Sequence, residues 1–195
     1  LVGSEMCIRD SCNGCAGYPK YDQVTGLLSF NRFREEVDSV IASGKGKSCL
    51  LVYTDLENFK YFNRKYGYAA GDQLLREFTG YIIDTLKKRN TAHFTRVVAD
   101  QFILFFEEKW NNGSIEAIKR INNGFIERQQ RKYPEAKLRL RTGVYKVEKD
   151  CDGASFAIDA ANYARRQIQD NSPETVCVYD LSLIHISEPT RLRRI

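Results

Sequence analysis

The sequence has little of what several functional classes require. It contains two histidines, and His93 is the only one outside the last 15 residues, so a Ser-His-Asp hydrolytic triad is a weak candidate. No apolar run approaches the ~20 residues that a membrane-spanning helix needs. Internal repeats and low-complexity linkers are absent too, and a length of 195 residues suits one domain with a full core.

Cysteine and net charge are also modest. Of six cysteines, only Cys12 and Cys15 form a C-x-x-C pair, and no second pair completes a zinc site. Unpaired thiols of a reducing compartment are therefore favoured over a zinc or redox role. We expect a cytoplasmic location, with membrane anchoring only through an upstream region. Part of the net charge of +5 comes from the terminal TRLRRI, so we expect no nucleic-acid partner.

The two ends of the chain differ from the rest. LVGSEMCIRDS and LSLIHISEPTRLRRI show neither helical nor strand periodicity, and they resemble translated adapter sequence of the kind left in metagenomic assemblies. The first also lacks the basic and long apolar segments of a signal peptide. We therefore expect residues 1–11 and 181–195 to be artefactual tails, and residues 12–180 to form one domain cut from a longer protein.

Hydrophobic periodicity predicts a domain that mixes helices and strands. Apolar residues at helical spacing, with Ser29 and Ser114 as N-cap candidates, indicate helices, and short runs such as SCLLVYT indicate strands. We expect helices at residues 30–43, 58–66, 71–88, 114–131 and 155–169, and strands at 48–54, 92–98, 102–107, 137–147 and 175–179. The fold class is therefore α/β (α+β).

Two acids stand where strands of one sheet are expected to meet. Asp55 follows the first apolar run, and Asp100 lies between the next two strands, in RVVADQF. Open α/β sheets bind ligands at the carboxyl ends of their strands, and paired carboxylates hold Mg²⁺ together with phosphate oxygens. The pair points to metal-assisted phosphoryl transfer. The turn is unusual, because Ala99 lacks the freedom at positive φ that two-residue hairpin turns favour.

The blocks DQVTGL, TDLENFKYFN, AAGDQLLREF, RVVADQF, RTGVY and AANYARRQ occur in this order. Together they resemble the GGDEF domain of diguanylate cyclases over residues 21–180, and six ordered blocks are a specific signal. The resemblance implies a nucleotidyl-cyclase or polymerase-palm-like fold, a central mixed sheet flanked by helices. Enzymes of this family join two GTP into cyclic di-GMP between two facing domains, so a homodimer is expected.

The resemblance assigns metal and guanine positions. Asp55 matches the metal-binding acid, the backbone of Leu56 a neighbouring ligand, and Asp100 the retained acid of the signature, a metal ligand and catalytic position; Mg²⁺ or Mn²⁺ is the implied cofactor. Asn63 and Asp72 match the guanine readers, and an amide and a carboxylate suit the guanine edge. Ordinary alternatives stay open: Asn63 as a helix-end residue, and Asp72 as the N-cap of the long helix.

The resemblance also assigns phosphate positions. The backbone amides of Asn58 and Phe59 would approach phosphate, and Lys60 and Arg165 match basic positions near the triphosphate. Arg165 replaces the usual Lys, which keeps the charge but not the shape. Gln169 stands where the family usually has Arg. The alternative for Lys60 and Arg165 is that they are solvated charges.

The signature itself is altered, because VADQF at residues 98–102 stands in place of Gly-Gly-Asp-Glu-Phe. Val98 and Ala99 put carbon atoms where the glycine backbone approaches nucleotide. Gln101, at a catalytic position, offers metal a neutral oxygen instead of a carboxylate. Each lost charge contact typically costs about 10²–10³ in rate. Arg89-Asn-Thr-Ala also lacks the acid of the family's product-inhibition site, so no such site is expected.

Three functional hypotheses follow. The first and favoured one is a degenerate GGDEF domain, catalytically inactive or weak, that binds GTP weakly or not at all and regulates a neighbouring domain, for example a downstream EAL phosphodiesterase. The second is an active diguanylate cyclase with a divergent signature, supported by Asp55 and Asp100. The third is a structural or dimerisation module without a ligand. GTP binding separates the first from the third, and turnover separates the second from both.

Overall fold

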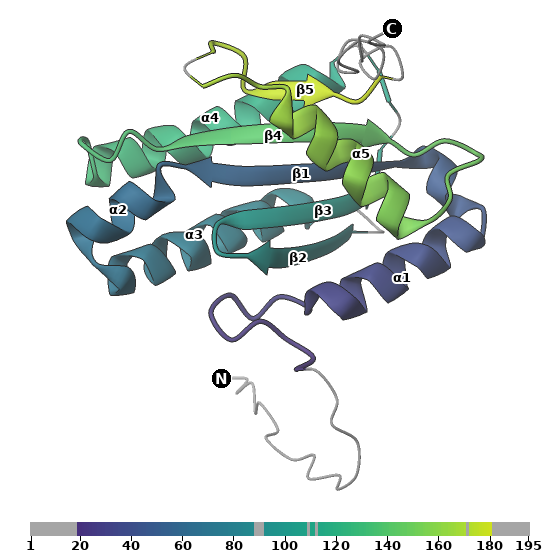
Figure 1. The fold of residues 1–195 in the computed structure, drawn as a ribbon, viewed down its shortest axis with the longest axis horizontal. Helices are drawn as coiled ribbons and strands as arrows, with labels where there is room; N and C mark the ends of the chain where they lie inside the picture. Colours follow the sequence, from purple (N-terminus) through teal and green to yellow (C-terminus); the bar gives the residue numbers. More distant parts are fainter. Residues whose placement is uncertain (1–18, 88–91, 109, 112, 171, 181–195) are drawn as a thin grey trace, which may run out of the picture.

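The computed structural model describes residues 19–87, 92–108, 110–111, 113–170 and 172–180 (Figure 1). Both expected tails, the Cys12–Cys15 pair and the Arg89 position lie outside the described residues. No helix in the described ranges is long and apolar enough to cross a membrane.

Helices and strands follow the predicted order. The helices are α1 (Phe30–Ala42), α2 (Phe59–Tyr66), α3 (Tyr68–Leu86), α4 (Ser114–Lys132) and α5 (Ala154–Arg166), with a 3₁₀ turn, η1 (Lys45–Ser48). The strands are β1 (Cys49–Glu57), β2 (Ala92–Val98), β3 (Gln101–Glu107), β4 (Arg139–Lys146) and β5 (Val176–Val178). They form one sheet in the order β2-β3-β1-β4-β5. Among the strands of the described residues, β4 and β5 pair in parallel and the other neighbours pair antiparallel, so the predicted mixed sheet is confirmed.

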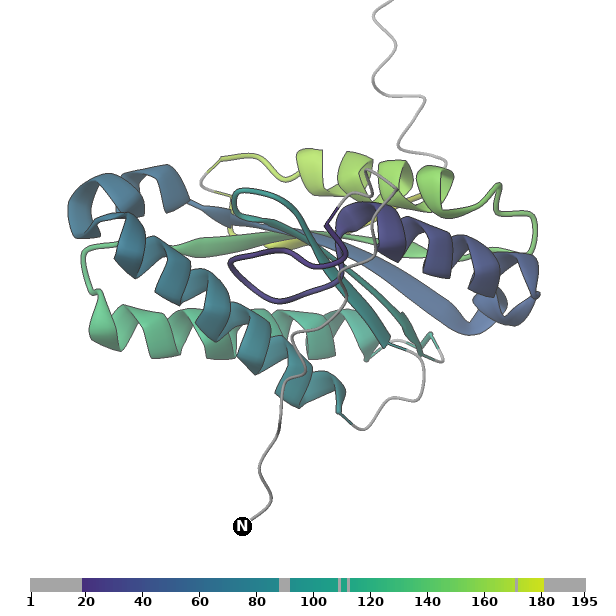
Figure 2. The same ribbon diagram turned by 90° about the horizontal axis from the view of Figure 1, so that it is seen from below.

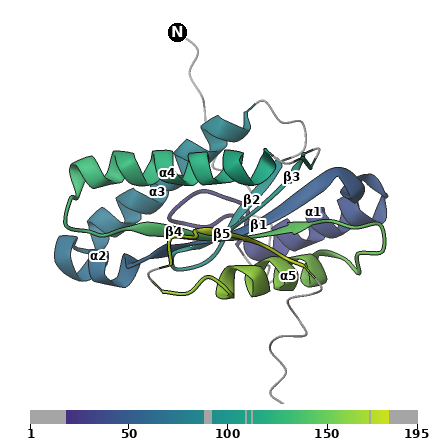
Figure 3. The same cartoon turned by 90° about the horizontal axis from the view of Figure 1, so that it is seen from above.

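Each face of the sheet is covered by a pair of helices. Figure 3 shows α3 and α4 on one face and α1 and α5 on the other. Side chains of β1 alternate between the two faces, because successive residues of a strand point to opposite sides. Leu50 and Val52 belong to the core under α3 and α4, whereas Leu51 and Tyr53 belong to the core under α1 and α5. Asp55 continues the second series and therefore lies on the α1–α5 face.

Aromatic side chains fill the core under α3. The ring of Phe78 packs edge-on against Phe94, Phe102 and Phe125, with centroid distances of 6.3, 4.9 and 5.0 Å. Such pairs contribute about 0.5–1.5 kcal/mol beyond their burial. They join α3 and α4 to the β2–β3 hairpin. Phe33, Phe78 and Phe94 are buried, whereas Phe30 is partly buried against the core under α1 and α5.

Several predicted boundaries are wrong. α3 begins at Tyr68 instead of residue 71, because Gly67 at φ 88° lets a new helix start directly after α2. Asp72 therefore lies inside α3 and is not its N-cap. Residue Gly113 precedes α4, and Ser29 makes no side-chain capping bond to α1. The end of α5 is earlier than predicted, so Gln169 lies beyond the helix.

Candidate active site

The acids Asp55 and Asp100 meet at one end of the sheet. Asp55 lies within β1, two residues before the strand ends, and it is paired with Gln101 on β3 and with Arg141 on β4. The backbone N–H of Leu56 donates to the carbonyl of Asp100 at 3.2 Å. Figure 1 shows that the β2–β3 turn, the end of β1 and α2 share this end. The prediction that the hairpin adjoins Asp55 is confirmed.

The signature turn is a two-residue hairpin with backbone strain. Val98 pairs with Gln101 across Ala99 and Asp100, and Ala99 adopts a left-handed φ of 48°. A residue with a Cβ in this conformation costs about 1–2 kcal/mol. The side chain of Arg96 supports the turn, since its Nε donates to the carbonyl of Ala99 at 2.6 Å. The conformation is the one that glycine would adopt without cost.

The loop at residues 22–28 braces the same hairpin. Figure 2 shows this segment lying across the β2–β3 hairpin. Oδ2 of Asp22 accepts hydrogen bonds from the backbone N–H and hydroxyl of Thr25 at 2.8 and 2.7 Å, and Arg96 Nη1 lies 3.3 Å from Asp22 Oδ1. Burial by itself would raise the pKa of Asp22, but the Thr25 bonds and the Arg96 charge outweigh it and lower that pKa.

Asp55 is held by two arginines. Its Oδ2 accepts hydrogen bonds from Arg165 Nη1 and, at 3.3 Å, from Arg141 Nη2. Asp55 is 6% exposed and Arg165 is 8% exposed, so this ion pair is shielded from water. The alternative that Arg165 is a solvated charge is therefore wrong. Arg141 also contacts the exposed Asp170 at 2.9 Å.

Arg165 is fixed by further contacts on α5 and β1. Its Nε and Nη2 donate to Asn162 Oδ1 at 3.0 and 2.8 Å. The guanidinium carbon lies 5.2 Å from the centre of the Tyr53 ring, within the range of a cation–π contact. Three groups therefore set the orientation of this side chain.

Gln101 also has a partner at its altered position. Its Oε1 accepts a hydrogen bond from the Tyr53 hydroxyl at 2.7 Å. Burial raises the pKa of Tyr53, so the hydroxyl stays protonated and donates. Burial likewise raises the pKa of Asp100, and the nearby charge of Asp55 raises it further. Negative charge is thus disfavoured at the turn.

These residues do not fit a divalent metal at Asp55. Mg²⁺ is octahedral and is usually bound by one or two carboxylates, with waters and phosphate oxygens as its other ligands, so Asp55 and the group at position 101 decide the fit. One oxygen of Asp55 is engaged by two guanidinium groups, and the Gln101 oxygen is engaged by Tyr53. Within the described ranges, no group of three or more His, Cys, Asp or Glu residues is arranged to hold a metal ion. The remaining Asp55 oxygen, Oδ1, is buried and lacks a hydrogen-bond partner there.

The two predicted guanine readers lie on α2 and α3. Asn63 Oδ1 is buried and has no hydrogen-bond partner among the described residues. A Cβ placed on Gly71 would fall 1.9 Å from this oxygen, so the glycine leaves the space that Asn63 occupies. Asp72 follows directly on α3 and is partly buried. An acceptor without a partner and a carboxylate both suit the N–H groups of a guanine edge.

The predicted phosphate positions lie at the start of α2. Asn58 precedes the helix with φ 68°, and its Nδ2 donates to the Lys137 carbonyl at 2.8 Å. Phe59 begins the helix with a buried ring, which leaves its backbone as the only group for a ligand. Lys60 is exposed. A helix start of this kind presents N–H groups that favour anions.

Sequence reasoning missed Arg141, Tyr53 and Asn162 as parts of the site. The sequence did contain a signal for Asn162 and Tyr53. Asn162 and Arg165 are three residues apart on a helix and therefore lie on the same face, and Tyr53 lies on the same face of the sheet as Asp55 because strand residues alternate. The contact of Arg141 with Asp55 depends on the register of β1 against β4, which the sequence does not reveal.

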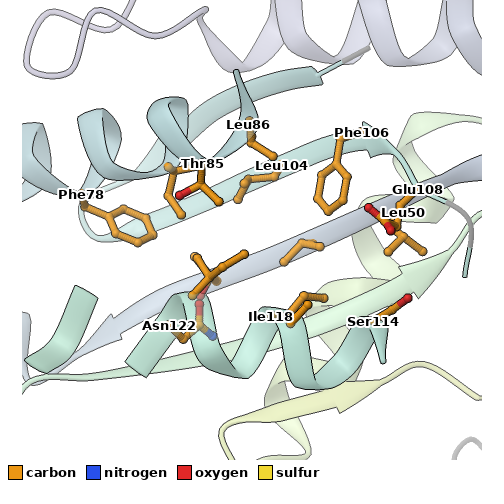
Figure 4. A pocket seen from close by; sticks show the side chains of 15 residues that line it. Leu50, Phe78, Thr85, Leu86, Leu104, Phe106, Glu108, Ser114, Ile118 and Asn122 are labelled. Atoms are coloured by element: carbon orange, nitrogen blue, oxygen red, sulfur yellow. The ribbon is translucent and has the colours of Figure 1, made fainter. Parts of the chain in front are cut away.

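A recess on the opposite face of the sheet is apolar. Figure 4 shows side chains from α3, α4 and the strands, among them Phe78, Leu104, Phe106 and Ile118, pointing into it. Its polar groups are largely used internally: Asn122 Nδ2 donates to the Thr142 hydroxyl at 2.8 Å. Such a lining does not suit a nucleotide, which needs charged and polar partners.

The chain matches a known family. Residues 19–173 match the family model described as "Diguanylate cyclase, GGDEF domain". Diguanylate cyclase DgcS of Shewanella oneidensis is 32% identical over 89 residues, which are 45% of this chain and 29% of that protein. Cyclic di-GMP phosphodiesterase PdeR of Escherichia coli is 28% identical over 130 residues, 67% of this chain and 18% of that protein. The chain thus spans less than a third of the length of these relatives.

Solved structures share the fold. The GGDEF domain of DgcB from Caulobacter crescentus, in complex with c-di-GMP, superposes with a TM-score of 0.69 at 18% identity, covering 92% of this chain and 99% of that chain. A structure of PA1120 (TpbB or YfiN) from Pseudomonas aeruginosa comprising only the GGDEF domain gives 0.69 at 18% identity, covering 85% and 98%. Together with the family match over residues 19–173, these findings mean that the chain belongs to the diguanylate cyclase GGDEF domain family.

Proposed function

We propose that this GGDEF domain takes part in bacterial cyclic di-GMP signalling as a regulatory domain that no longer synthesises the dinucleotide. In this proposal the guanine pocket at Asn63 and Asp72 still binds GTP weakly, and the bound state is passed to a neighbouring domain. The family match supports the signalling context. The state of the signature turn supports the loss of synthesis.

The observation that carries the proposal is the hydrogen bond from the Tyr53 hydroxyl to Gln101 Oε1, at 2.7 Å. A glutamate at position 101 would add a negative charge where the reaction needs one. Gln101 supplies a neutral oxygen instead, and that oxygen already has a donor. Losing one such charge contact typically costs about 10²–10³ in rate, and the substitutions at Val98, Ala99 and Gln169 add to this loss.

The same proposal includes the wider protein. We propose that this domain is cytoplasmic and forms a homodimer in which the signature turns of two copies face each other. We also propose that the intact protein carries further domains, such as an EAL phosphodiesterase. One relative carries the name of a cyclic di-GMP phosphodiesterase, and this chain covers 18% of it. That share supports the idea of a regulatory domain within a larger chain.

A product assay on the full chain tests the loss of synthesis. The protein is incubated at high concentration with GTP and either Mg²⁺ or Mn²⁺, and cyclic di-GMP is quantified by mass spectrometry. An Asp100→Asn variant gives the background, and circular dichroism checks that both samples are folded. We expect no product above that background. Product that disappears in the variant would make this a divergent but active cyclase.

GTP titration by calorimetry separates the regulatory role from a purely structural one. We expect weak binding that falls in an Asn63→Ala variant, because Asn63 Oδ1 is a buried acceptor with no partner of its own among the described residues. An Asn123→Ala variant on α4, away from the pocket, is the matched control. Absence of binding in the unaltered chain would leave a dimerisation module.

A further inference from the structure

Asp55, Arg141 and Arg165 form a cluster in which two guanidinium groups face one carboxylate; Asp55 and Arg165 are buried, and the Arg141 side chain is 24% exposed. Both guanidinium groups donate to Asp55 Oδ2. The second acid in contact with the cluster, Asp170, lies in solvent, with a side chain that is 80% exposed. Asp55 is therefore neutralised from within the chain, at the position where the family resemblance expects a metal ion.

The cluster is built into the fold. Arg165 is aimed at Asp55 by Asn162, which accepts hydrogen bonds from its Nε and Nη2 at 3.0 and 2.8 Å, and by the ring of Tyr53 at 5.2 Å. Arg141 is aimed at Asp55 by the pairing of β1 with β4, since the two residues are direct partners across these strands. The two arginines reach Asp55 from different elements, and neither depends on a ligand for its placement.

A divalent cation would be opposed at this site. Like charges repel strongly where water is excluded, because the effective dielectric constant is low. A metal at Asp55 would stand beside two guanidinium groups and would find one open Asp55 oxygen, Oδ1. Keeping the ion pairs of Asp55 with the arginines costs less free energy than replacing them with a metal ion, because breaking a buried ion pair leaves an uncompensated charge.

Arg141 also has unused capacity for an anion. Its Nε is buried and lacks a hydrogen-bond acceptor among the described residues. An unsatisfied buried donor is costly, and a guanidinium group binds phosphate oxygens with paired donors. Because the Arg141 side chain is 24% exposed, the cluster can neutralise Asp55 and still offer a guanidinium group to a phosphate group.

We propose that Arg141 and Arg165 take the place of the divalent cation at Asp55, so that the site rejects Mg²⁺ and Mn²⁺ and meets nucleotide phosphates with guanidinium groups alone. The rejection of metal stands on the ion cluster. The metal-free binding of phosphate rests on the proposed function, because it requires that GTP binds.

Mn²⁺ alone tests the first part. The free Mn²⁺ signal in electron paramagnetic resonance is recorded with the unaltered chain, with an Arg141→Met/Arg165→Met variant, and with that variant carrying Asp55→Asn. We expect no depletion of the signal by the unaltered chain. The double variant should bind Mn²⁺ and gain about 5 °C in melting temperature at saturating metal, and Asp55→Asn should abolish both effects.

Two results would overturn the rejection of metal. One is Mn²⁺ binding by the unaltered chain that is lost in a single Asp55→Asn variant. Another is a folded double variant that binds no Mn²⁺, since the arginines would then not be what excludes the metal. If the double variant does not fold, the unaltered chain and Asp55→Asn still decide the question, and Arg165→Lys is expected to bind Mn²⁺ no better than the unaltered chain.

GTP titration with EDTA and then with Mg²⁺ tests the second part. We expect the two affinities to agree within twofold, and Arg141→Met to weaken binding tenfold while Arg120→Met on the exposed face of α4 does not. A requirement for Mg²⁺, or no GTP binding in either buffer, would overturn the metal-free binding of nucleotide. Synthesis of cyclic di-GMP would instead overturn the proposed function, and the Mn²⁺ comparison would still be decisive by itself.

Discussion

Gly143 lies so close to Arg165 that a Cβ at position 143 would fall 2.4 Å from the backbone nitrogen of Arg165. The same atom would fall 1.9 Å from the carbonyl oxygen of Ala161. Both distances are far inside van der Waals contact, so α5 can approach β4 only because position 143 carries no side chain. The face of α5 in this contact is made of small residues, including Ala160, Ala161 and Ala164. This close approach brings Arg165 within reach of Asp55.

Gly143→Ala should therefore destabilise the domain. The backbone of α5 cannot rotate away as a side chain can, so the helix must shift, and we expect a loss of about 1–3 kcal/mol in the free energy of unfolding. Urea unfolding followed by circular dichroism measures it. Gly80→Ala is the control, because nothing lies within 4 Å of its added Cβ and alanine is favoured in a helix by about 1 kcal/mol. Equal effects of the two changes would contradict the argument.

Ala99→Gly should stabilise the hairpin. Ala99 has a φ of 48°, which costs an alanine about 1–2 kcal/mol, while glycine loses roughly 0.5–1 kcal/mol more than alanine in conformational entropy on folding. We expect a net gain of about 0.5–1 kcal/mol from these two terms, measured by urea unfolding. Val98→Gly is the contrasting variant. Val98 lies in β2 without a positive φ, so glycine there should lower stability; a gain there would show that the effect is not conformational.

Much of the fold could be predicted because it depends on local periodicity. The helix expected at residues 30–43 is observed as Phe30–Ala42, and the strands expected at 92–98 and 102–107 are β2 and β3 within one residue. The error at the start of α3 has a specific cause. A glycine at positive φ allowed two helices to follow each other directly, where the sequence GYAAGD favoured a loop.

The sequence located Asp55 and Asp100 relative to the strands, but it did not reveal the contacts of Asp55. Asp55 and Asp100 lie at the same end of the sheet as expected, because each stands near the end of a strand that local hydrophobic periodicity locates. The ion pairs of Asp55 with Arg141 and Arg165 join residues 86 and 110 positions apart, and they depend on strand register and on how closely α5 packs. Neither quantity can be obtained from spacing along the chain. The matched motif therefore located Arg165 near the site but did not reveal its ion pair with Asp55.

A buried polar chain under α4 gives another prediction. Asn122 Nδ2 donates to Thr142 Oγ1 at 2.8 Å, and that hydroxyl lies 2.6 Å from Thr54 Oγ1. All three residues are buried. Asn122→Ala leaves a void and removes the donor to Thr142, so we expect a loss of about 1–3 kcal/mol in unfolding free energy. Asn123→Ala, at the next position of α4 and exposed, should change stability little, and a similar loss there would contradict the role of the buried chain.

Acid should remove the contribution of Asp22. Its pKa is lowered in the folded state, chiefly because the Thr25 bonds and then the Arg96 charge outweigh burial. A lowered pKa stabilises the fold above the ordinary pKa of Asp, and this contribution is lost as the pH falls through the folded-state value. We expect Asp22→Asn to cost about 1 kcal/mol at pH 7 and progressively less as the pH falls below the ordinary pKa of Asp. Urea midpoints across this range measure it, and a difference that persists in acid would assign the effect to geometry instead of charge.

Restoring the signature should not restore synthesis. A Val98→Gly/Ala99→Gly/Gln101→Glu variant recovers the Gly-Gly-Asp-Glu-Phe sequence, relieves the strain at Ala99 and adds a carboxylate beside Tyr53. Asp55 nevertheless stays paired with Arg141 and Arg165, so the acid that would hold metal is still occupied. We expect this variant to fold and to give no cyclic di-GMP above its Asp100→Asn counterpart by mass spectrometry.

The ion cluster predicts which further change would matter. With Arg141→Ser and Arg165→Lys added to the restored signature, one guanidinium group disappears and the other becomes a flexible ammonium group, which leaves Asp55 without its planar partners. Product should appear first in this combined variant, and adding Asp55→Asn to it should abolish the product. Synthesis by the restored signature alone would mean that the signature turn limits the reaction. It would also mean that metal displaces the arginines from Asp55 once a second carboxylate is present at position 101.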